Sequence, residues 1–321
     1  MSPSQIRRIL VIKHGGLGDI VQAEGAFRDI RQAHPTADIA VLTAPPFVKL
    51  FERCPHVDRV LADPRAPRWR LDKFLLLGLS LKAQNFDLVY DLQNSGRTAD
   101  YRRYFLSRPG WSGKAVSATY RFDMANFASR RSFDRLAAQL KVAGIRPVHA
   151  KTPDLTWMIG DAAPFLDQAG ITEPPVVLLP GSSSTHPQKR WPGYAALAEA
   201  LSARGETVVF APGPDELDLV GHFPATPIVA PRGFLDFFEL AGLFARAKAV
   251  IGNDSGPTHL AAQLRRPGVA LFGGQIDPAR TGITDTRFEV IERIPLKDVS
   301  VDEVLAAADR ACNQAVREEL A

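Results

Sequence analysis

An aspartate that could act as a catalytic base lies near the N-terminus, in the stretch HGGLGDIV (His14–Val21). Three glycines precede Asp19, and glycines let the backbone approach a ligand closely, here where a helix is expected to begin. Such a turn suits an anionic or hydroxyl-rich ligand, and a carboxylate there can take a proton from a substrate hydroxyl. The alternative role of Asp19 is to cap the helix, which stabilises a helix by about 1 kcal/mol. The local sequence leaves both roles open.

The same stretch does not match two common nucleotide-binding motifs. A dinucleotide fingerprint, G-x-G-x-x-G/A, would need a small residue in place of Val21 and a carboxylate after the second strand, which ends in Thr43–Pro45. The P-loop pattern G-x-x-x-x-G-K-[ST] occurs nowhere in the chain. The sequence therefore argues against an NAD-binding protein and against a P-loop NTPase.

Two turns in the second half of the chain contain residues typical of phosphate sites. LLPGSSSTHPQKRWP (Leu178–Pro192) joins hydroxyls, backbone amides and a lysine at a helix start, and GNDSGPTHL (Gly252–Leu260) repeats the order strand, turn, helix. Two such turns in one domain favour a nucleotide diphosphate over a single inorganic anion. The alternatives are that Leu178–Pro192 is a plain surface loop and that His259 is a packed structural histidine. The candidate residues are Ser182, Ser183, Ser184, Thr185, Lys189, Asp254, Ser255, Gly256, Thr258 and His259.

Alternating strand-like and helix-like segments surround these turns in both halves of the chain, which predicts βαβ units and parallel sheets. A stretch rich in proline and turn residues, 146–175, separates the halves. We therefore predict two doubly wound α/β domains facing a central cleft, with ligands at the carboxyl ends of the strands. The predicted bounds are 1–157 for the first domain, 158–300 for the second and 301–321 for a final helix.

Composition supports a globular enzyme of two domains. The chain has 321 residues, of which 45% are hydrophobic and 23% charged. Its longest apolar run, FLLLGLSL (Phe74–Leu81), is far shorter than the roughly 20 residues that span a bilayer. The N-terminus enters a strand without a signal segment, and two cysteines without metal-type spacing suit a reducing compartment. We expect a cytoplasmic protein.

Charge is divided unevenly between the halves. Residues 1–157 hold 25 Lys and Arg against 14 Asp and Glu, a net charge of +11, whereas residues 158–321 hold 14 against 21, a net charge of −7. This asymmetry favours an anionic partner for the first half, although a solvated basic face is the simpler alternative. Nucleic acid is the least favoured partner, because the basic residues show no nucleic-acid motif.

Taken together, IKHGGLGDIV, LLPGSSSTHPQKRWP and GNDSGPTHLAAQL followed by GVALFGG resemble the ADP-heptose:lipopolysaccharide heptosyltransferases, glycosyltransferase family 9. The resemblance covers nearly the whole chain in the family's order and spacing. It implies the GT-B fold, in which the first of two Rossmann-like domains binds the acceptor and the second binds the sugar nucleotide. It also implies that the final helix packs back on the first domain.

The resemblance assigns roles residue by residue. Asp19 matches the family's catalytic aspartate, and Lys189 matches the lysine on the donor phosphates, next to Ser182–Thr185. Asp254 to His259 match the donor loop D-[ST]-G-x-[ST]-H, and Glu216 resembles the carboxylate that holds the adenosine ribose. The acceptor-side candidates, which include the basic loop RAPRWRLDK, are Gly16, Gly18, Arg65, Arg68, Arg70, Lys73, Arg97, Arg130 and Arg131.

The reaction that this resemblance implies is inverting glycosyl transfer from an ADP-sugar to an anionic, lipid-linked oligosaccharide, with peripheral contact at the inner membrane face. No D-x-D triplet occurs, so we expect no metal and no cofactor. Many family members have two serines where this chain has Gly15-Gly16, and the family includes transferases for other sugars. Two further alternatives are a sugar-nucleotide epimerase or isomerase, which would leave the basic half unexplained, and a non-catalytic nucleotide-binding subunit, for which Asp19 would be dispensable.

Overall fold

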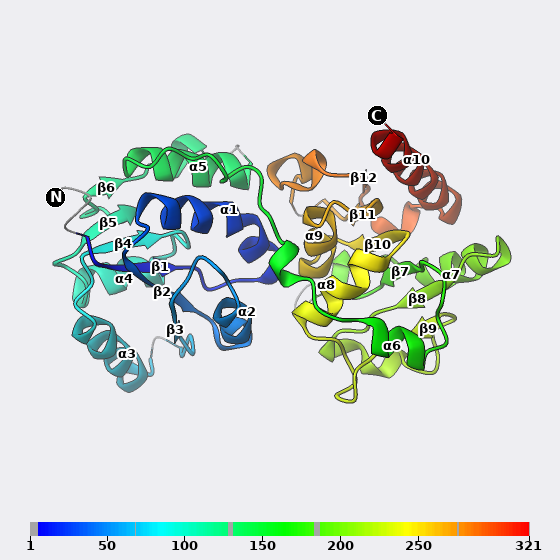
Figure 1. Cartoon of the computed structure of the whole chain (residues 1–321), viewed down its shortest axis with the longest axis horizontal. Coiled ribbons are helices and arrows are strands. Elements are labelled where there is room, and N and C mark those ends of the chain that lie inside the picture. Colours follow the sequence, from blue (N-terminus) through cyan, green and yellow to red (C-terminus); the bar gives the residue numbers. More distant parts are fainter. Residues whose placement is uncertain (1–5, 68, 128–130, 183–186, 275, 321) are drawn as a thin grey trace. The chain divides into compact units, whose positions relative to one another are not determined.

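The structure is a computed structural model that describes residues 6–67, 69–127, 131–182, 187–274 and 276–320. The chain divides into two compact units, Met1–Trp157 and Met158–Ala321, which we call the first and second domains (Figure 1). Among the described residues, no helix is both long and apolar enough to cross a membrane.

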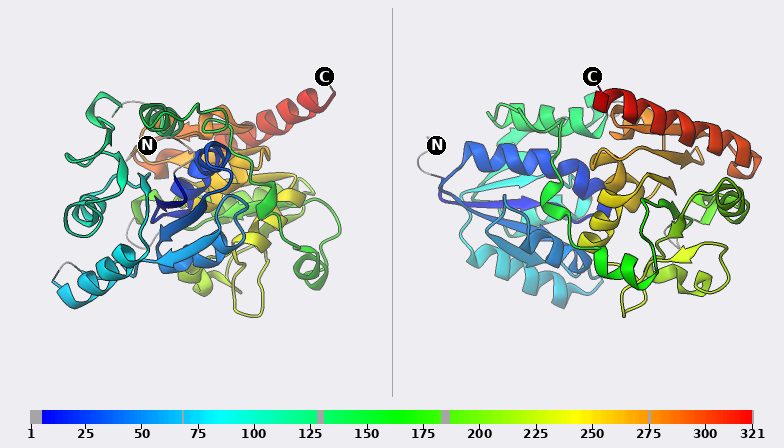
Figure 2. Two further views of the ribbon diagram at one scale, coloured as in Figure 1. Left: turned by 60° about the vertical axis from the view of Figure 1, so that its left-hand side comes forward. Right: turned by 45° about the vertical axis from the view of Figure 1, so that its right-hand side comes forward.

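The first domain is a parallel six-stranded sheet with the strand order β3-β2-β1-β4-β5-β6. Helices α1 and α5 cover one face of this sheet, and α3 covers the other (Figure 2). Its elements are β1 (Arg8–Ile12), α1 (Leu17–Ala33), β2 (Asp38–Thr43), α2 (Val48–Glu52), β3 (Arg59–Ala62), α3 (Leu71–Ala83), β4 (Leu88–Asp91), α4 (Gly96–Tyr104), β5 (Gly110–Gly113), β6 (Tyr120–Arg121) and α5 (Ser132–Val142).

The second domain is also a parallel six-stranded sheet, with the strand order β12-β11-β10-β7-β8-β9. Its elements are α6 (Ala163–Gln168), β7 (Val176–Leu179), α7 (Tyr194–Ala203), β8 (Val208–Phe210), β9 (Thr226–Pro227), α8 (Phe237–Arg246), β10 (Ala249–Asn253), α9 (Gly256–Gln263), β11 (Gly268–Phe272), β12 (Phe288–Glu292) and α10 (Val301–Leu320).

Both sheets have the same topology. Counted from the first strand of each domain, the spatial order is 3-2-1-4-5-6, the order of dinucleotide-type doubly wound folds. The direction of winding reverses between β1 and β4 in the first domain and between β7 and β10 in the second. Ligands of such sheets bind outside the carboxyl ends of the strands at this switch point. The predicted glycine stretch and both predicted phosphate turns follow strands that flank a switch point.

The central strands are continuous apolar runs because helices cover both faces of a parallel sheet. Ile9–Ile12 of β1 and Val250–Ile251 of β10 are fully buried. Helix α10 packs against β11, β12 and α7 within the second domain. Its packing on the first domain, as the resemblance implies, stays a prediction.

Helix α1 begins two residues earlier than predicted from sequence. Its N-cap is Gly16, and Asp19 is the third residue of the helix rather than its cap. The Asp19 side chain is exposed and makes no hydrogen bond with another described residue. Its negative charge in the first turn still complements the helix dipole. The capping role that we considered for Asp19 is therefore wrong, and its carboxylate is free to contact a ligand.

A buried carboxyl at the end of β4 makes the stability of the first domain depend on pH. Burial raises the pKa of Asp91 to about 6, although its carboxylate accepts the Asn94 N–H at 2.8 Å. An unfolded aspartate has a pKa near 3.9, so the folded state binds this proton more tightly and the free energy of unfolding falls as pH rises from about 4 to 6.

We expect Asp91→Asn to remove this dependence. The free energy of unfolding of the variant minus that of the wild type should increase by about 2–3 kcal/mol from pH 4 to pH 7, because the amide cannot ionise. Urea unfolding of both proteins at the two pH values measures the difference. Equal pH dependence in the two proteins would contradict this role of Asp91.

Candidate active site

The second domain brings both predicted phosphate turns together at its switch point. Ser182 follows β7, and Asp254 and Ser255 follow β10, the neighbouring strand. Ser255 is the N-cap of α9, which begins at Gly256 and has Pro257 in its first turn. A helix N-terminus carries partial positive charge and unpaired backbone N–H groups. This end of the sheet is therefore suited to an anion.

An ionic cluster centred on Asp254 lies at this point. Lys189 Nζ is 2.5 Å from Asp254 Oδ2, and His259 Nε2 is 3.2 Å from Asp254 Oδ1. Burial opposes ionisation of Asp254, but the hydrogen bonds from His259 and Lys189 outweigh it and lower its pKa. The cluster holds the lysine ammonium in a fixed place although Lys189 and Asp254 are 65 residues apart in sequence.

Asn253 and Thr258 brace the two turns from behind. Asn253 donates from Nδ2 to the Pro180 carbonyl at 2.9 Å, and its Oδ1 accepts the Trp191 N–H at 3.1 Å. Thr258 donates from Oγ1 to the Asn253 carbonyl at 2.6 Å. Asn253 was not among the residues predicted from sequence, although a polar residue that ends a buried strand could have marked it. Both side chains are fully buried, so they position the turns.

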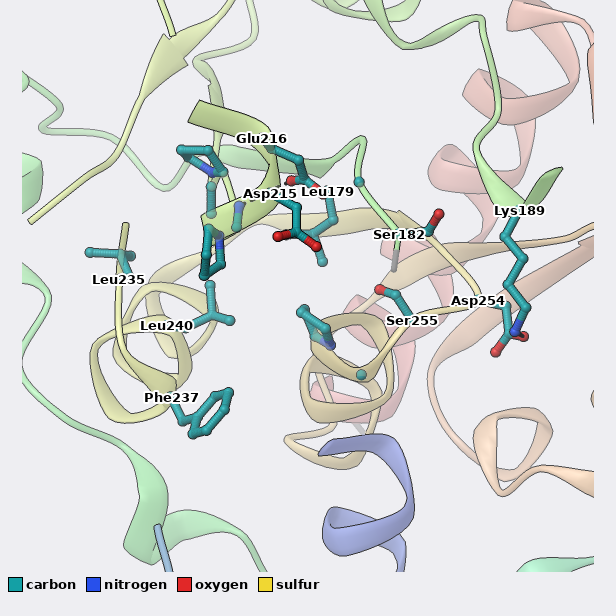
Figure 3. Close-up of a pocket in the computed structure, with 17 residues that line it drawn as sticks. Leu179, Ser182, Lys189, Asp215, Glu216, Leu235, Phe237, Leu240, Asp254 and Ser255 are labelled. Carbon is teal, nitrogen blue, oxygen red and sulfur yellow. Dashed lines mark hydrogen bonds and ion pairs between the residues drawn. The ribbon is translucent and has the colours of Figure 1, made fainter. Parts of the chain in front are cut away.

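A cavity of about 370 Å³ adjoins the cluster (Figure 3). One part of its wall is apolar and includes Leu235, Phe237 and Leu240, and the other part includes the Lys189–Asp254 pair. An apolar wall beside a few directed polar groups is the usual construction of a nucleotide site. The volume and the two kinds of wall suit a nucleoside on one side and its phosphates on the other.

Glu216 also lines this cavity, as the ribose role assigned to it requires. Its Oε2 accepts the Gly213 N–H at 3.0 Å, and burial raises the pKa of the carboxyl. The backbone of Gly181 runs so close to Glu216 that a Cβ at position 181 would collide with its carboxylate. The glycine at position 181 therefore leaves room for Glu216 to lie in the cavity.

The first domain has a second, smaller cavity of about 150 Å³ at the end of β1. Asp19 lies on its wall together with Lys13, Asn94 and Arg135. Burial lowers the pKa of Lys13; the nearby Asp19 carboxylate opposes that shift and the Arg135 charge adds to it. A hydroxyl-bearing anionic ligand would meet a carboxylate, a buried amine and a guanidinium here.

Lys13 and Arg135 were not among the site residues predicted from sequence. Lys13 could have been found from sequence, because a charged residue directly after the buried run Ile9–Ile12 must face the carboxyl end of the sheet. Arg135 lies in α5, far from β1 in sequence, and no local pattern indicates that it reaches the same cavity. Only the folded sheet brings these residues together.

Arg97, one of the predicted acceptor residues, takes part in a buried network. Its guanidinium donates to both oxygens of Asp63 at 2.9 and 3.0 Å, and Tyr101 donates to the same carboxylate at 2.5 Å. His14 Nε2 lies 3.1 Å from Asp63. Burial opposes ionisation of Asp63, but these partners hold its pKa well below the usual range. Arg97 thus has a structural role, and its contact with an acceptor stays a prediction.

The other acceptor-side candidates lie in exposed or partly exposed parts of the first domain. Arg70 forms two hydrogen bonds with Asp72, at 2.9 and 2.7 Å, and Arg131 lies 3.4 Å from Asp134. The exposed or partly exposed candidates are Gly16, Gly18, Arg65, Arg70, Lys73 and Arg131. The remaining predicted residues, Arg68, Arg130, Ser183, Ser184 and Thr185, lie outside the described residues.

The two doubly wound domains define the GT-B class of fold. The structure of E. coli ADP-heptose lps heptosyltransferase II is similar with a TM-score of 0.73 and 23% identity, over 96% of this chain and 99% of that one. E. coli heptosyltransferase WaaC with ADP-2-deoxy-2-fluoro heptose is similar with a TM-score of 0.70 and 19% identity, over 97% and 99%.

Sequence comparison adds the family to the fold. The model of glycosyltransferase family 9 (heptosyltransferase) matches residues 75–300. Lipopolysaccharide heptosyltransferase 2 of Escherichia coli K12 is 28% identical over 301 residues, which cover 83% of this chain and 82% of that protein. This chain belongs to glycosyltransferase family 9 and is a glycosyltransferase. The predicted family and fold class are confirmed.

Proposed function

We propose that this protein transfers a heptose, or a related sugar, from an ADP-sugar to an anionic inner-core acceptor of lipopolysaccharide. The observation that carries this proposal is the second-domain cavity, where an apolar wall and the Lys189–Asp254 pair meet at the start of α9. The similar proteins are lipopolysaccharide heptosyltransferases, which supports the sugar and the acceptor. The similar WaaC structure contains ADP-2-deoxy-2-fluoro heptose, an ADP-sugar analogue, which supports the donor.

In this proposal three parts of the donor, its adenine, ribose and diphosphate, bind different parts of the cavity. The adenine contacts the apolar wall with Leu235 and Phe237, and the ribose hydroxyls bind Glu216. The diphosphate binds Lys189 and the backbone N–H groups of the turn at Asp254–Gly256. We assign Ser182–Thr185 to the same phosphates. Lys189 and the end of α9 supply positive charge for the leaving group, so the proposal includes no metal and no cofactor.

The proposed reaction inverts the anomeric centre. An acceptor hydroxyl attacks the anomeric carbon from the face opposite ADP, the new C–O bond forms, and the bond from that carbon to the phosphate oxygen breaks. Asp19 takes the proton of the hydroxyl as the general base, and ADP leaves with the electron pair of the broken bond. The exposed position of the Asp19 carboxylate supports this role.

The proposed acceptor side is the first domain. Its net charge of +11 and the Arg135 guanidinium beside Asp19 suit an acceptor that carries carboxylates or phosphates. We place the enzyme in the cytoplasm, in peripheral contact with the inner membrane face, where a lipid-linked acceptor would be reached. An epimerase needs no acceptor, and the membership of a transferase family argues against that alternative.

The test is transfer of labelled sugar from ADP-heptose to a deacylated Kdo-containing core oligosaccharide. We expect product with ADP-heptose and little or none with UDP- or GDP-sugars as matched controls, because the cavity is assigned to adenosine. Binding of ADP-heptose without transfer would exclude this acceptor. If no ADP-sugar binds, the proposed donor is wrong.

A further inference from the structure

Helix α3 has an apolar surface that no described part of its own domain covers. Its inner side, with Phe74, Leu77 and Leu81, packs against the core of the first domain. The outer side of α3 is also apolar. Soluble proteins rarely expose a contiguous apolar patch, and such patches mark interaction sites. We call the following four residues, which are 63, 51, 65 and 58% exposed, the leucine face: Leu71, Leu75, Leu76 and Leu79.

An aromatic residue extends the leucine face at the start of the helix. Trp69 precedes α3 by two residues and is 76% exposed. Tryptophan is enriched where protein meets the headgroup level of a membrane, because its ring is apolar and its N–H is polar. Figure 2 shows α3 at the outer side of the first domain. The patch therefore combines four leucines with an interfacial aromatic residue.

Basic residues near this patch indicate that the surface it contacts is negatively charged. Lys73 and Lys82 of α3 are exposed, as is Arg65 in the preceding loop, whereas the acidic Asp72 is paired with Arg70. The whole first half of the chain has a net charge of +11. A second copy of this chain would bring two such halves together, and their like charges would repel. The complementary partner is an anionic apolar surface.

We propose that the leucine face docks this enzyme on a bilayer that contains anionic lipid. The leucines and Trp69 enter the boundary between headgroups and acyl chains, and the basic residues lie at the level of the lipid phosphates. This inference rests on the proposed function, since a lipid-linked acceptor is presented at such a surface. It adds that α3 is the helix that makes the contact with the membrane.

The first measurement is co-sedimentation with vesicles of phosphatidylcholine alone or mixed with phosphatidylglycerol. We expect binding to the anionic vesicles only, weakened by salt because the contact is partly electrostatic. The variant Leu75→Gln/Leu76→Gln/Leu79→Gln should lower the partition coefficient at least about tenfold, since it removes most of the inserted apolar area. The matched control replaces three exposed valines elsewhere: Val116→Gln/Val148→Gln/Val316→Gln.

A second measurement does not depend on the folding of the leucine variant. Trp69 fluorescence of the otherwise unchanged protein should be quenched by brominated acyl chains in anionic vesicles, and the Trp69→Phe variant should lose that quenching. Trp111 and Trp191, which are buried, should contribute little, and the half-buried Trp157 contributes equally to the signals of the wild type and of the Trp69→Phe variant. Absence of binding to anionic vesicles, or equal loss of binding in the leucine variant and the valine control, would overturn the proposal. A dimer that the leucine variant splits would also overturn it.

The two proposals fail in different ways. With the deacylated soluble acceptor, the leucine variant should retain wild-type transfer, and with acceptor embedded in anionic vesicles its rate should fall at least about tenfold. Wild-type vesicle binding without transfer to any acceptor would count against the proposed function alone. Normal transfer to the soluble acceptor without vesicle binding would count against the docking surface alone.

Discussion

Replacing Asp19 with asparagine should lower kcat for sugar transfer by about 10²- to 10⁴-fold, the usual contribution of a positioned general base. The amide keeps the size and polarity of the side chain but cannot take the proton of the acceptor hydroxyl. Donor affinity should stay within about twofold, because the proposed donor contacts all lie in the second domain. Initial rates and titration calorimetry with ADP-heptose measure the two effects.

A matched control separates catalysis from helix stability. Asp302 is also an exposed aspartate in the first turn of a helix, α10, and both positions contribute about 0.3–1 kcal/mol through the helix dipole. Asp302→Asn should therefore reproduce the small loss of stability without the loss of transfer. If Asp19→Asn keeps more than half of the wild-type rate, Asp19 is not the base.

Removing the Lys189 ammonium should have the second large effect. Lys189→Ala should lower kcat by about 10²- to 10³-fold and weaken donor binding, because the developing charge on the leaving diphosphate loses a fixed cation. The expected loss is large since the lysine is held 2.5 Å from Asp254 and needs no reorganisation when the reaction occurs. Single-turnover rates and the Kd of ADP measure the two contributions.

Two further variants test whether this effect is chemical or structural. Lys189→Ala leaves a buried carboxylate without one partner, which costs stability, and adding Asp254→Asn should restore stability but not transfer. Lys248→Ala, which breaks an exposed ion pair with Glu206 in the same domain, should change neither. Recovery of transfer in the Lys189→Ala/Asp254→Asn variant would contradict a direct role of Lys189.

The class of this protein followed from the sequence because its signals are local. Apolar runs of strand length, each followed by a turn and a helix, predict parallel sheets. The glycine and hydroxyl turns follow these runs directly, so the sequence predicts ligand sites at the carboxyl ends of the strands. Asp254 lies in such a turn, Lys189 ends a short 3₁₀ helix after another, and Asp19 lies in the first turn of the helix that follows the glycines.

Local sequence does not explain why this chain has glycine at both positions 15 and 16. The family resemblance predicts serine at the positions of Gly15 and Gly16. Gly15 has φ of 112°, which disfavours any residue with a Cβ, and a Cβ there would meet the ring of Phe47. Gly16 has open space around it. The first glycine is thus required by the folded backbone, and the second is not.

Only the tertiary structure decided which distant residues share a site. It placed Lys13 and Arg135 beside Asp19 and paired Lys189 with Asp254, and it bound the guanidinium of Arg97 to Asp63. These pairings depend on strand order, because a different order would bring other side chains together at the carboxyl edge of the sheet. Periodicity reports which residues are buried, but it carries no information on which buried strands are adjacent. The sequence therefore determined the family and supplied the candidates for the reacting groups, and the fold decided which charged side chains surround them.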